Sequence, residues 1–142
     1  MCPFCDQKNL QPRLIYQDDL IRAFPTNIPI VPGHTLICPV RHAAKIDELS
    51  DQELKAIKDF LIRLKEGLRK SFNAIGFNIA WNEGVAGGQE VDHLHIHVLP
   101  RTNGDTGVYG YEPRQFLYRP GARSESPVQE LQEIAMLIRK NI

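Results

Sequence analysis

The sequence lacks a long apolar run, a net charge and an even number of cysteines. No apolar stretch approaches the ~20 residues of a membrane-spanning helix, and residues 1–20 lack the apolar centre of a signal peptide, so we expect no membrane partner. Lys plus Arg and Asp plus Glu balance at 17 each, which removes the basic field that a nucleic-acid partner would require. The three cysteines cannot all pair within one chain, which favours a cytoplasmic protein over a disulfide scaffold.

A length of 142 residues is typical of one domain, and we treat 1–142 as a single domain. The pattern predicts an α+β fold with a largely antiparallel sheet, one long helix packed on it and a C-terminal helix starting near Pro127. Residues 50–72 predict the long helix because Ser50 and Glu53 form a capping box. Its predicted packed face is apolar at helical spacing: Leu54, Ile57, Leu61, Leu64 and Leu68.

Three of the five histidines alternate with apolar residues in the stretch VDHLHIHVLPR, residues 91–101. This alternation predicts a strand over 91–99, ended by Pro100, with His93, His95 and His97 on one face. Neighbouring imidazoles would lie roughly 6.6 Å apart, a spacing that suits an extended polyphosphate. A lone strand histidine is more often a surface residue, and a metal ion held by all three is disfavoured because positions i, i+2 and i+4 do not converge.

Two stretches resemble the histidine-triad superfamily of nucleotide hydrolases and transferases. Residues 87–99 (GGQEVDHLHIHVL) carry the alternating histidines, and residues 29–39 (PIVPGHTLICP) are similar to the family's Pro-Gly-His turn and strand. The resemblance covers residues 1–101, whereas 102–142 form a C-terminal extension without recognisable family sequence. It implies a homodimer whose sheets join, and hydrolysis or nucleotidyl transfer at the α-phosphate of a small nucleotide, either a dinucleoside polyphosphate or a nucleoside phosphoramidate.

The resemblance also implies roles for three histidines. His95 would be the nucleophile that forms a nucleotidyl-imidazole intermediate, since an imidazole with a pKa of about 6.5 is mostly uncharged near pH 7. His97 and His34 would donate to phosphate oxygens or protonate the leaving group. This chemistry requires no organic cofactor.

Loop 83–89 feeds into these histidines. A Gly-Gly pair is more often only a turn, but by resemblance the loop amides, including that of Gly88, would surround the reacting phosphate together with Asn82 and Gln89. Glu90 stands where many relatives carry Ser or Thr. A carboxylate there repels a phosphate unless it points away or pairs with a cation.

Ribose recognition departs from the family pattern. Relatives commonly carry Asp or Asn eight residues before the histidine of the Pro-Gly-His turn, where it holds the ribose hydroxyls. Here that position is Thr26, with Asn27 beside it, and either residue is a candidate for the contact.

The N-terminus contains Cys2 and Cys5 in a Cys-x-x-Cys pair, which is half a metal site and could equally be redox-active or inert. Some histidine-triad proteins open with such a pair. Their zinc is completed by a histidine just after the Pro-Gly-His strand and by the first triad histidine, which correspond to His42 and His93. The resemblance therefore implies a closed structural Cys₂His₂ zinc site.

Two other function classes stay open. A nucleotide-sensing module would bind a nucleoside monophosphate tightly with negligible turnover. A zinc-stabilised interaction protein would show zinc-dependent melting and no nucleotide binding. The segment 102–121 is either an ordinary loop or a lid over the nucleotide, rich in aromatic and basic residues: Tyr109, Tyr111, Arg114, Phe116, Tyr118 and Arg119.

Overall fold

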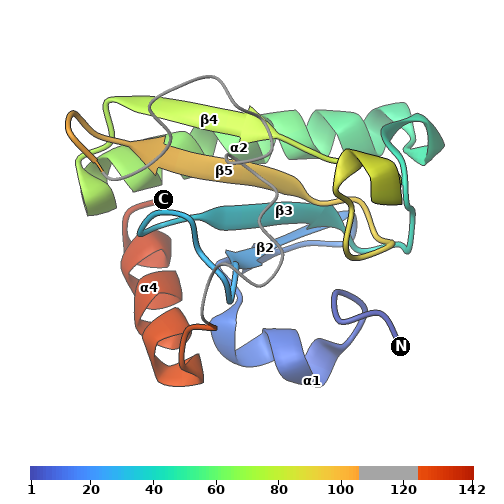
Figure 1. Ribbon diagram of the computed structural model, residues 1–142, viewed down its shortest axis with the longest axis horizontal. Helices are drawn as coiled ribbons and strands as arrows, with labels where there is room; N and C mark the ends of the chain where they lie inside the picture. Colours follow the sequence, from blue (N-terminus) through green and yellow to red (C-terminus); the bar gives the residue numbers. More distant parts are fainter. Residues whose placement is uncertain (106–124) are drawn as a thin grey trace.

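Figure 1 shows an antiparallel sheet flanked by helices, in a computed structural model that describes residues 1–105 and 125–142. Within these residues the sheet has five strands in the spatial order β1-β2-β3-β5-β4, so the predicted α+β class is confirmed. The strands are β1 (Tyr16–Gln17), β2 (Ile21–Pro25), β3 (Thr35–Pro39), β4 (Gly76–Ala80) and β5 (Ile96–Arg101). The helices are α1 (Gln7–Leu10), α2 (Asp51–Phe72), α4 (Val128–Lys140) and the 3₁₀ turns η1 (Gln11–Arg13), η2 (Ile46–Glu48) and η3 (Val85–Gly87).

The long helix α2 runs along one face of the sheet (Figure 1). It begins at a capping box in which the Ser50 hydroxyl accepts a hydrogen bond from the Glu53 amide at 3.1 Å and the Glu53 carboxylate accepts one from the Ser50 amide at 2.9 Å. It ends where Asn73 turns into the left-handed conformation with φ of 56°. The helix predicted over 50–72 is therefore confirmed.

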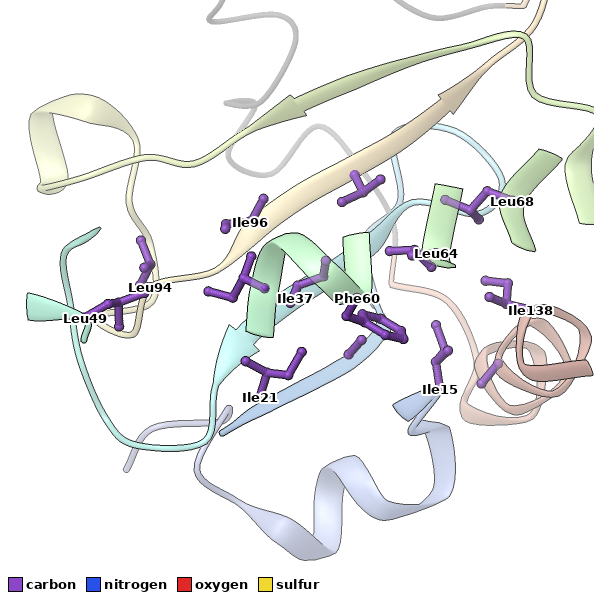
Figure 2. Packing of buried hydrophobic residues seen from close by; sticks show 14 of the residues in the cluster. Ile15, Ile21, Ile37, Leu49, Phe60, Leu64, Leu68, Leu94, Ile96 and Ile138 are labelled. Carbon is purple, nitrogen blue, oxygen red and sulfur yellow. The ribbon is translucent and has the colours of Figure 1, made fainter. Parts of the chain in front are cut away.

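Figure 2 shows the main core, which lies between α2 and the sheet. Phe60, Leu64 and Leu68 of α2 pack over Ile37 of β3 and its neighbours on the same face. Burial of this apolar surface is the main force that holds α2 on the sheet. Helix α4 adds Leu131, Ala135 and Ile138 as buried residues, and its predicted start after Pro127 is confirmed.

One predicted core position is wrong. Leu54 is 38 % exposed. In α2 the buried stripe passes through Glu53, Ile57 and Phe60, so Leu54 falls at its margin. The other predicted positions are confirmed, because Ile57, Leu64 and Leu68 are buried and Leu61 packs partly buried against the core.

Truncation of the buried Leu64 of α2 is expected to destabilise the fold far more than truncation of the exposed Leu54. Leu64→Ala, at a fully buried position, should lower the free energy of unfolding by about 2–5 kcal/mol. Leu54→Ala, the matched control on the same helix, should cost less than about 1 kcal/mol. Urea unfolding of both variants measures the difference, and equal losses would contradict this description of the core.

Alternate strand residues point to the opposite face of the sheet. There they form a second, smaller cluster with the N-terminal segment: Phe4, Leu10, Phe24, Leu36 and Cys38. His97 is paired with Leu36 in the register between β3 and β5, so it lies on this second face, away from α2. The candidate site is therefore built where the N-terminal segment covers the sheet.

Strand β5 begins later than the alternation predicts. Its pairing with β3 ends at Ile37 and Ile96, and the Leu94 amide instead donates to the Ala43 carbonyl at 2.6 Å. His93 and His95 therefore precede the strand, and the expectation that three histidines share one strand face is wrong. A competing backbone partner in the loop after β3 draws this segment off the sheet.

Pro100 does not end β5, which continues to Arg101. Pro100 is paired with Phe77 of β4, whereas the pairing with β3 has already stopped at Val98. Because β4 is the one strand paired with β5 at this point among the described strands, the missing N–H donor of proline is tolerated.

Over residues 1–105 and 125–142, the structure contains no helix with both the length and the apolar character to cross a membrane. The proposed aromatic and basic lid, over 102–121, lies outside the described residues beyond Asp105.

Candidate active site and metal cluster

A hollow of about 240 Å³ opens on the sheet face opposite α2. His34, His95 and His97 line it together, and His93 does not. We call it the histidine hollow. Its other walls come from the N-terminal segment, the end of β2 and the loop before β5, and include Phe4, Arg13, Phe24, Thr26, Asn82 and Glu90. The volume suits part of a nucleotide rather than a macromolecule.

The ring of His95 is held in one tautomer. Its Nδ1 lies 2.8 Å from the carbonyl oxygen of His93, and because a carbonyl only accepts, Nδ1 carries the proton. The lone pair of a neutral His95 is then on Nε2. Burial lowers the pKa of His95, while the bond to the His93 carbonyl and the charge of Glu90 act in the opposite direction. Burial therefore favours the uncharged, nucleophilic form of this imidazole.

His34 and His97 form a hydrogen-bonded pair with a defined direction. The Ile30 amide donates to Nδ1 of His34 at 3.1 Å, so the proton of neutral His34 is on Nε2. That Nε2 lies 2.9 Å from Nδ1 of His97 and donates to it. The proton of neutral His97 is then on its Nε2. The His97 ring lies beside that of His95, with centroids 4.9 Å apart, so a hydrogen-bond donor stands next to a nucleophile.

Loop 83–89 satisfies most of its hydrogen bonds internally. The amides of Gly87 and Gln89 both donate to the Gly84 carbonyl, and the Gly88 amide donates to Val85. Gly88 and Asn82 line the hollow, but the Asn82 amide donates to the Gly88 carbonyl at 3.3 Å. These bonds occupy the backbone amides of Gly87, Gly88 and Gln89, whereas the predicted substrate contacts of Asn82 and Gly88, which line the hollow, stay predictions.

Gln89 is buried, and its side chain bridges two loops. Its Oε1 accepts from the Gly84 amide at 2.8 Å and its Nε2 donates to the Ala44 carbonyl at 3.0 Å. Gln89 is also absent from the lining of the hollow. We therefore correct its expected contact with substrate: its amide fixes the loop. Its preference for Ala44 depends on packing between segments 45 residues apart, which no local pattern reveals.

Thr26 and Asn27 both line the hollow, so both candidates for the ribose contact lie at the site. The Thr26 hydroxyl accepts from the Ile28 amide at 3.3 Å. Sequence reasoning missed Arg13, which is buried beside them and donates to the Pro25 carbonyl at 2.9 Å. Its guanidinium carbon lies 5.2 Å from the centre of the Phe24 ring. Arg13 brings a positive charge to the wall of the hollow.

Four candidate metal ligands lie together outside the lining of the hollow, next to Phe4, which does line it. We call Cys2, Cys5, His42 and His93 the Cys₂His₂ cluster; their ligand atoms all lie within 4.8 Å of one another. Sγ of Cys2 is 3.4 Å from Nδ1 of His93, and Sγ of Cys5 is 3.4 Å from Nδ1 of His42. Ligands about 2.0–2.3 Å from a tetrahedral zinc would lie roughly 3.5 Å apart, so the donor set and its spacing fit the ion.

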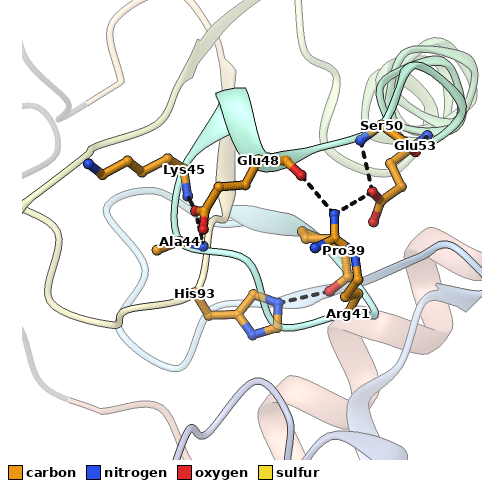
Figure 3. Close-up of polar contacts among 8 residues, drawn as sticks. All are labelled: Pro39, Arg41, Ala44, Lys45, Glu48, Ser50, Glu53 and His93. Carbon is orange, nitrogen blue, oxygen red and sulfur yellow. Dashed lines mark hydrogen bonds and ion pairs between the residues drawn. The ribbon is translucent and has the colours of Figure 1, made fainter.

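The proton position of His93 also fits a ligand role. Figure 3 shows its ring pointing at the Pro39 carbonyl, which accepts from Nε2 at 2.8 Å. Nδ1 therefore carries the lone pair, and it faces the two thiols. A backbone carbonyl behind a metal-binding histidine is a common arrangement in metal sites. The third cysteine is not part of this group, because Cys38 packs in the second cluster, where burial also raises its pKa to about 12.

A polar network holds the loop that carries His42. Arg41 donates to the Glu48 carbonyl at 2.8 Å and to the Glu53 carboxylate at 2.7 Å, as Figure 3 shows. The Glu48 carboxylate accepts from the amides of Ala44 and Lys45. Glu53, which takes part in the capping box of α2, therefore also holds Arg41 in the loop beside the Cys₂His₂ cluster.

The HIT domain profile matches residues 7–104. An uncharacterized HIT-like protein of Methanocaldococcus jannaschii is 37 % identical over 110 residues, which cover 76 % of this chain and 84 % of that protein. The asymmetrical bis(5'-nucleosyl)-tetraphosphatase of Schizosaccharomyces pombe is 33 % identical over 93 residues, covering 66 % and 51 % of the two chains. The crystal structure of a Zn-bound histidine triad family protein from Mycobacterium smegmatis has a TM-score of 0.74 at 28 % identity, covering 99 % of this chain and 91 % of that one.

Proposed function

The chain belongs to the HIT domain family, and from that premise we propose that it hydrolyses or transfers small nucleotides at the α-phosphate through a covalent nucleotidyl-His95. One observation carries the proposal. The bond from His95 Nδ1 to the His93 carbonyl leaves the Nε2 lone pair as the nucleophile of a ring that lines the hollow. The tetraphosphatase activity in the name of the fission-yeast relative supports the same bond class.

In the first step, His95 Nε2 attacks the α-phosphorus. The N–P bond forms as the bond from phosphorus to the bridging atom breaks, and the leaving group takes the electron pair. A phosphate leaves as its anion, whereas an amine leaves after taking up a proton from solvent. His95 becomes positively charged, and the His93 carbonyl on Nδ1 stabilises that charge. Before the attack the His95 imidazole is neutral, so it meets no electrostatic repulsion from the anionic phosphate.

We propose that His97 donates a hydrogen bond to the phosphate oxygens and that His34 positions His97. The His97 Nε2–H donates a hydrogen bond to a non-bridging oxygen, where negative charge must be stabilised. Complete transfer of this proton would leave an imidazolate, so we favour a hydrogen-bond donor over a general acid. His34 fixes the His97 tautomer through the bond of 2.9 Å. In the second step water attacks phosphorus, the N–P bond breaks, His95 regains its lone pair, and the proton that the water loses passes to solvent.

We also propose that the Cys₂His₂ cluster binds a structural zinc ion. Four protein ligands leave no open position for substrate, which separates such a site from a catalytic one. The donor set, the sulfur-to-nitrogen distances near 3.4 Å and the Zn-bound relative support this assignment. The ion would join the N-terminal segment to the loops that follow β3 and precede β5.

A side-by-side assay tests the function. The protein is expected to release nucleoside monophosphate from a dinucleoside polyphosphate, from a nucleoside phosphoramidate, or from both, at a rate well above that of the His95→Asn variant. The ratio of kcat/KM values identifies the preferred bond, since the two substrates present the same nucleotidyl group with different leaving groups.

Negligible turnover of both substrates would contradict the enzymatic proposal. Tight binding of nucleoside monophosphate under those conditions would favour the sensing module. Absence of nucleotide binding, together with zinc-dependent melting, would favour the interaction protein.

We propose a homodimer joined through β4. This strand lies at the edge of the sheet and has β5 as its one neighbour among the described strands. Ile79 on β4 is 40 % exposed and Trp81 just after it is 43 % exposed, so this edge offers apolar side chains that a partner strand could cover. Light scattering of the purified protein at several concentrations tests the assignment.

A further inference from the structure

Phe4 connects the Cys₂His₂ cluster to the proposed nucleophile. It lies between Cys2 and Cys5 in the sequence, yet it is only 7 % exposed and lines the histidine hollow. Its ring centroid is 5.0 Å from that of His95, with the rings at 74°, and 6.0 Å from that of His93. One side chain therefore contacts both a candidate metal ligand and the ring that attacks phosphorus.

The position of the His95 ring depends on its neighbours. One hydrogen bond, from Nδ1 to the His93 carbonyl, fixes the tautomer but leaves the ring free to tilt about that bond. The His97 ring, at 61° to it, limits the tilt on one side. The edge-on Phe4 ring adds a second wall. Attack on phosphorus requires aligned atoms, so a lateral wall beside the ring has a direct effect on rate.

The position of Phe4 depends in turn on how the N-terminal turn is held. Arg22, which is 2 % exposed, donates from Nη1 to the Phe4 carbonyl at 3.0 Å. The side chains of Cys2 and Cys5 reach His42 and His93 on the loops beside the sheet. A metal ion bound by all four residues would fix Cys2 and Cys5, which lie on either side of Phe4 in the turn. Phe4 would then be held between two fixed residues.

We propose that Phe4 is a positioning residue for His95, and that metal binding to the Cys₂His₂ cluster sets the reactivity of the histidine hollow through the Phe4 ring. This inference rests on the proposed function for its effect on turnover. The geometric part, a coupling between the metal cluster and the His95 ring, does not depend on it.

The experiment compares zinc-loaded wild type with Phe4→Ala and Phe4→Leu. Phe4→Ala is expected to keep one zinc per chain, because it changes no ligand, and to lower kcat by about tenfold or more with little change in KM. Phe4→Leu keeps most of the wall and should recover most of that loss. Phe60→Leu, a buried aromatic in the main core, is the matched control and should lower stability without changing kcat.

Metal removal supplies the second arm. Chelation should lower kcat of wild type by a factor similar to that of Phe4→Ala, and should lower kcat of Phe4→Ala little further, since both changes remove the same constraint. The imidazole nitrogen signals of His95, assigned by their loss in His95→Asn, should broaden or shift in chelated wild type and in Phe4→Ala but not in Phe60→Leu.

Three results would overturn the inference. The first is wild-type kcat in Phe4→Ala, or a rise in KM alone, which would make Phe4 only a substrate contact. The second is an equal fold loss on chelation in wild type and Phe4→Ala. The third is an unchanged His95 signal in both. If no substrate is turned over by wild type, the proposed function fails, and the His95 signals alone decide this inference.

Discussion

Replacing His95 with asparagine is expected to abolish turnover while leaving the fold intact. The asparagine side-chain amide occupies a place close to that of imidazole Nδ1, so it can still donate to the His93 carbonyl. It has no counterpart of Nε2, so no N–P bond can form. We expect loss of the covalent nucleophile to lower kcat by about 10⁴-fold or more. The measurement is nucleotide release from whichever substrate the wild type prefers.

Binding and fold provide the controls for this variant. His95→Asn should retain the wild-type circular dichroism spectrum and should still bind nucleoside monophosphate, because Thr26, Asn27 and Arg13 are untouched. Rapid acid quenching of wild type during turnover should give a peptide containing His95 with the mass of one added nucleotidyl group. Activity within tenfold of wild type in His95→Asn would rule out the nucleophile assignment.

Replacing Cys5 with serine is expected to remove the metal and to lower the melting temperature by roughly 10 °C. Serine is a poor zinc ligand, and the remaining three ligands leave the site open. The rest of the domain keeps its core between α2 and the sheet, so the chain should stay folded at room temperature. Metal analysis and thermal unfolding measure the two effects.

The matched control is Cys38→Ala, which removes a cysteine that lies in the second cluster and not among the candidate ligands. It should retain a full equivalent of zinc. The metal assignment would be contradicted if metal analysis found no zinc in the purified wild type, or if Cys5→Ser and wild type contained equal amounts of zinc.

Local signals predicted most of the fold. The capping box of Ser50 and Glu53 located the start of α2 because its hydrogen bonds join residues three apart. The strand period failed at His93, since the bond from the Leu94 amide to the Ala43 carbonyl joins segments about fifty residues apart. Only tertiary packing decides which partner such an amide finds.

In the candidate site too, some residues were predicted from the sequence and others were found only in the structure. The resemblance named the four residues of the Cys₂His₂ cluster, and the structure brings them together. It also named Gln89, whose side chain turns to Ala44 instead. Arg13 and Phe4 carry no motif, and their place at the hollow follows from how the N-terminal segment folds across the sheet. Sequence therefore identifies the reactive groups better than the groups that position them.

The hydrogen bonds within the turn over residues 84–89 affect the design of a variant that binds nucleotide without hydrolysing it. The amides of Gly87, Gly88 and Gln89 already donate to carbonyls of the same turn, so among the described residues these three amides are not available to bind an anion. In the proposed mechanism, phosphate binding then depends on His97, which is separate from the attacking ring of His95. A variant that captures nucleotide firmly without consuming it should come from changing the attacking ring alone, and redesign of the glycine turn should yield none.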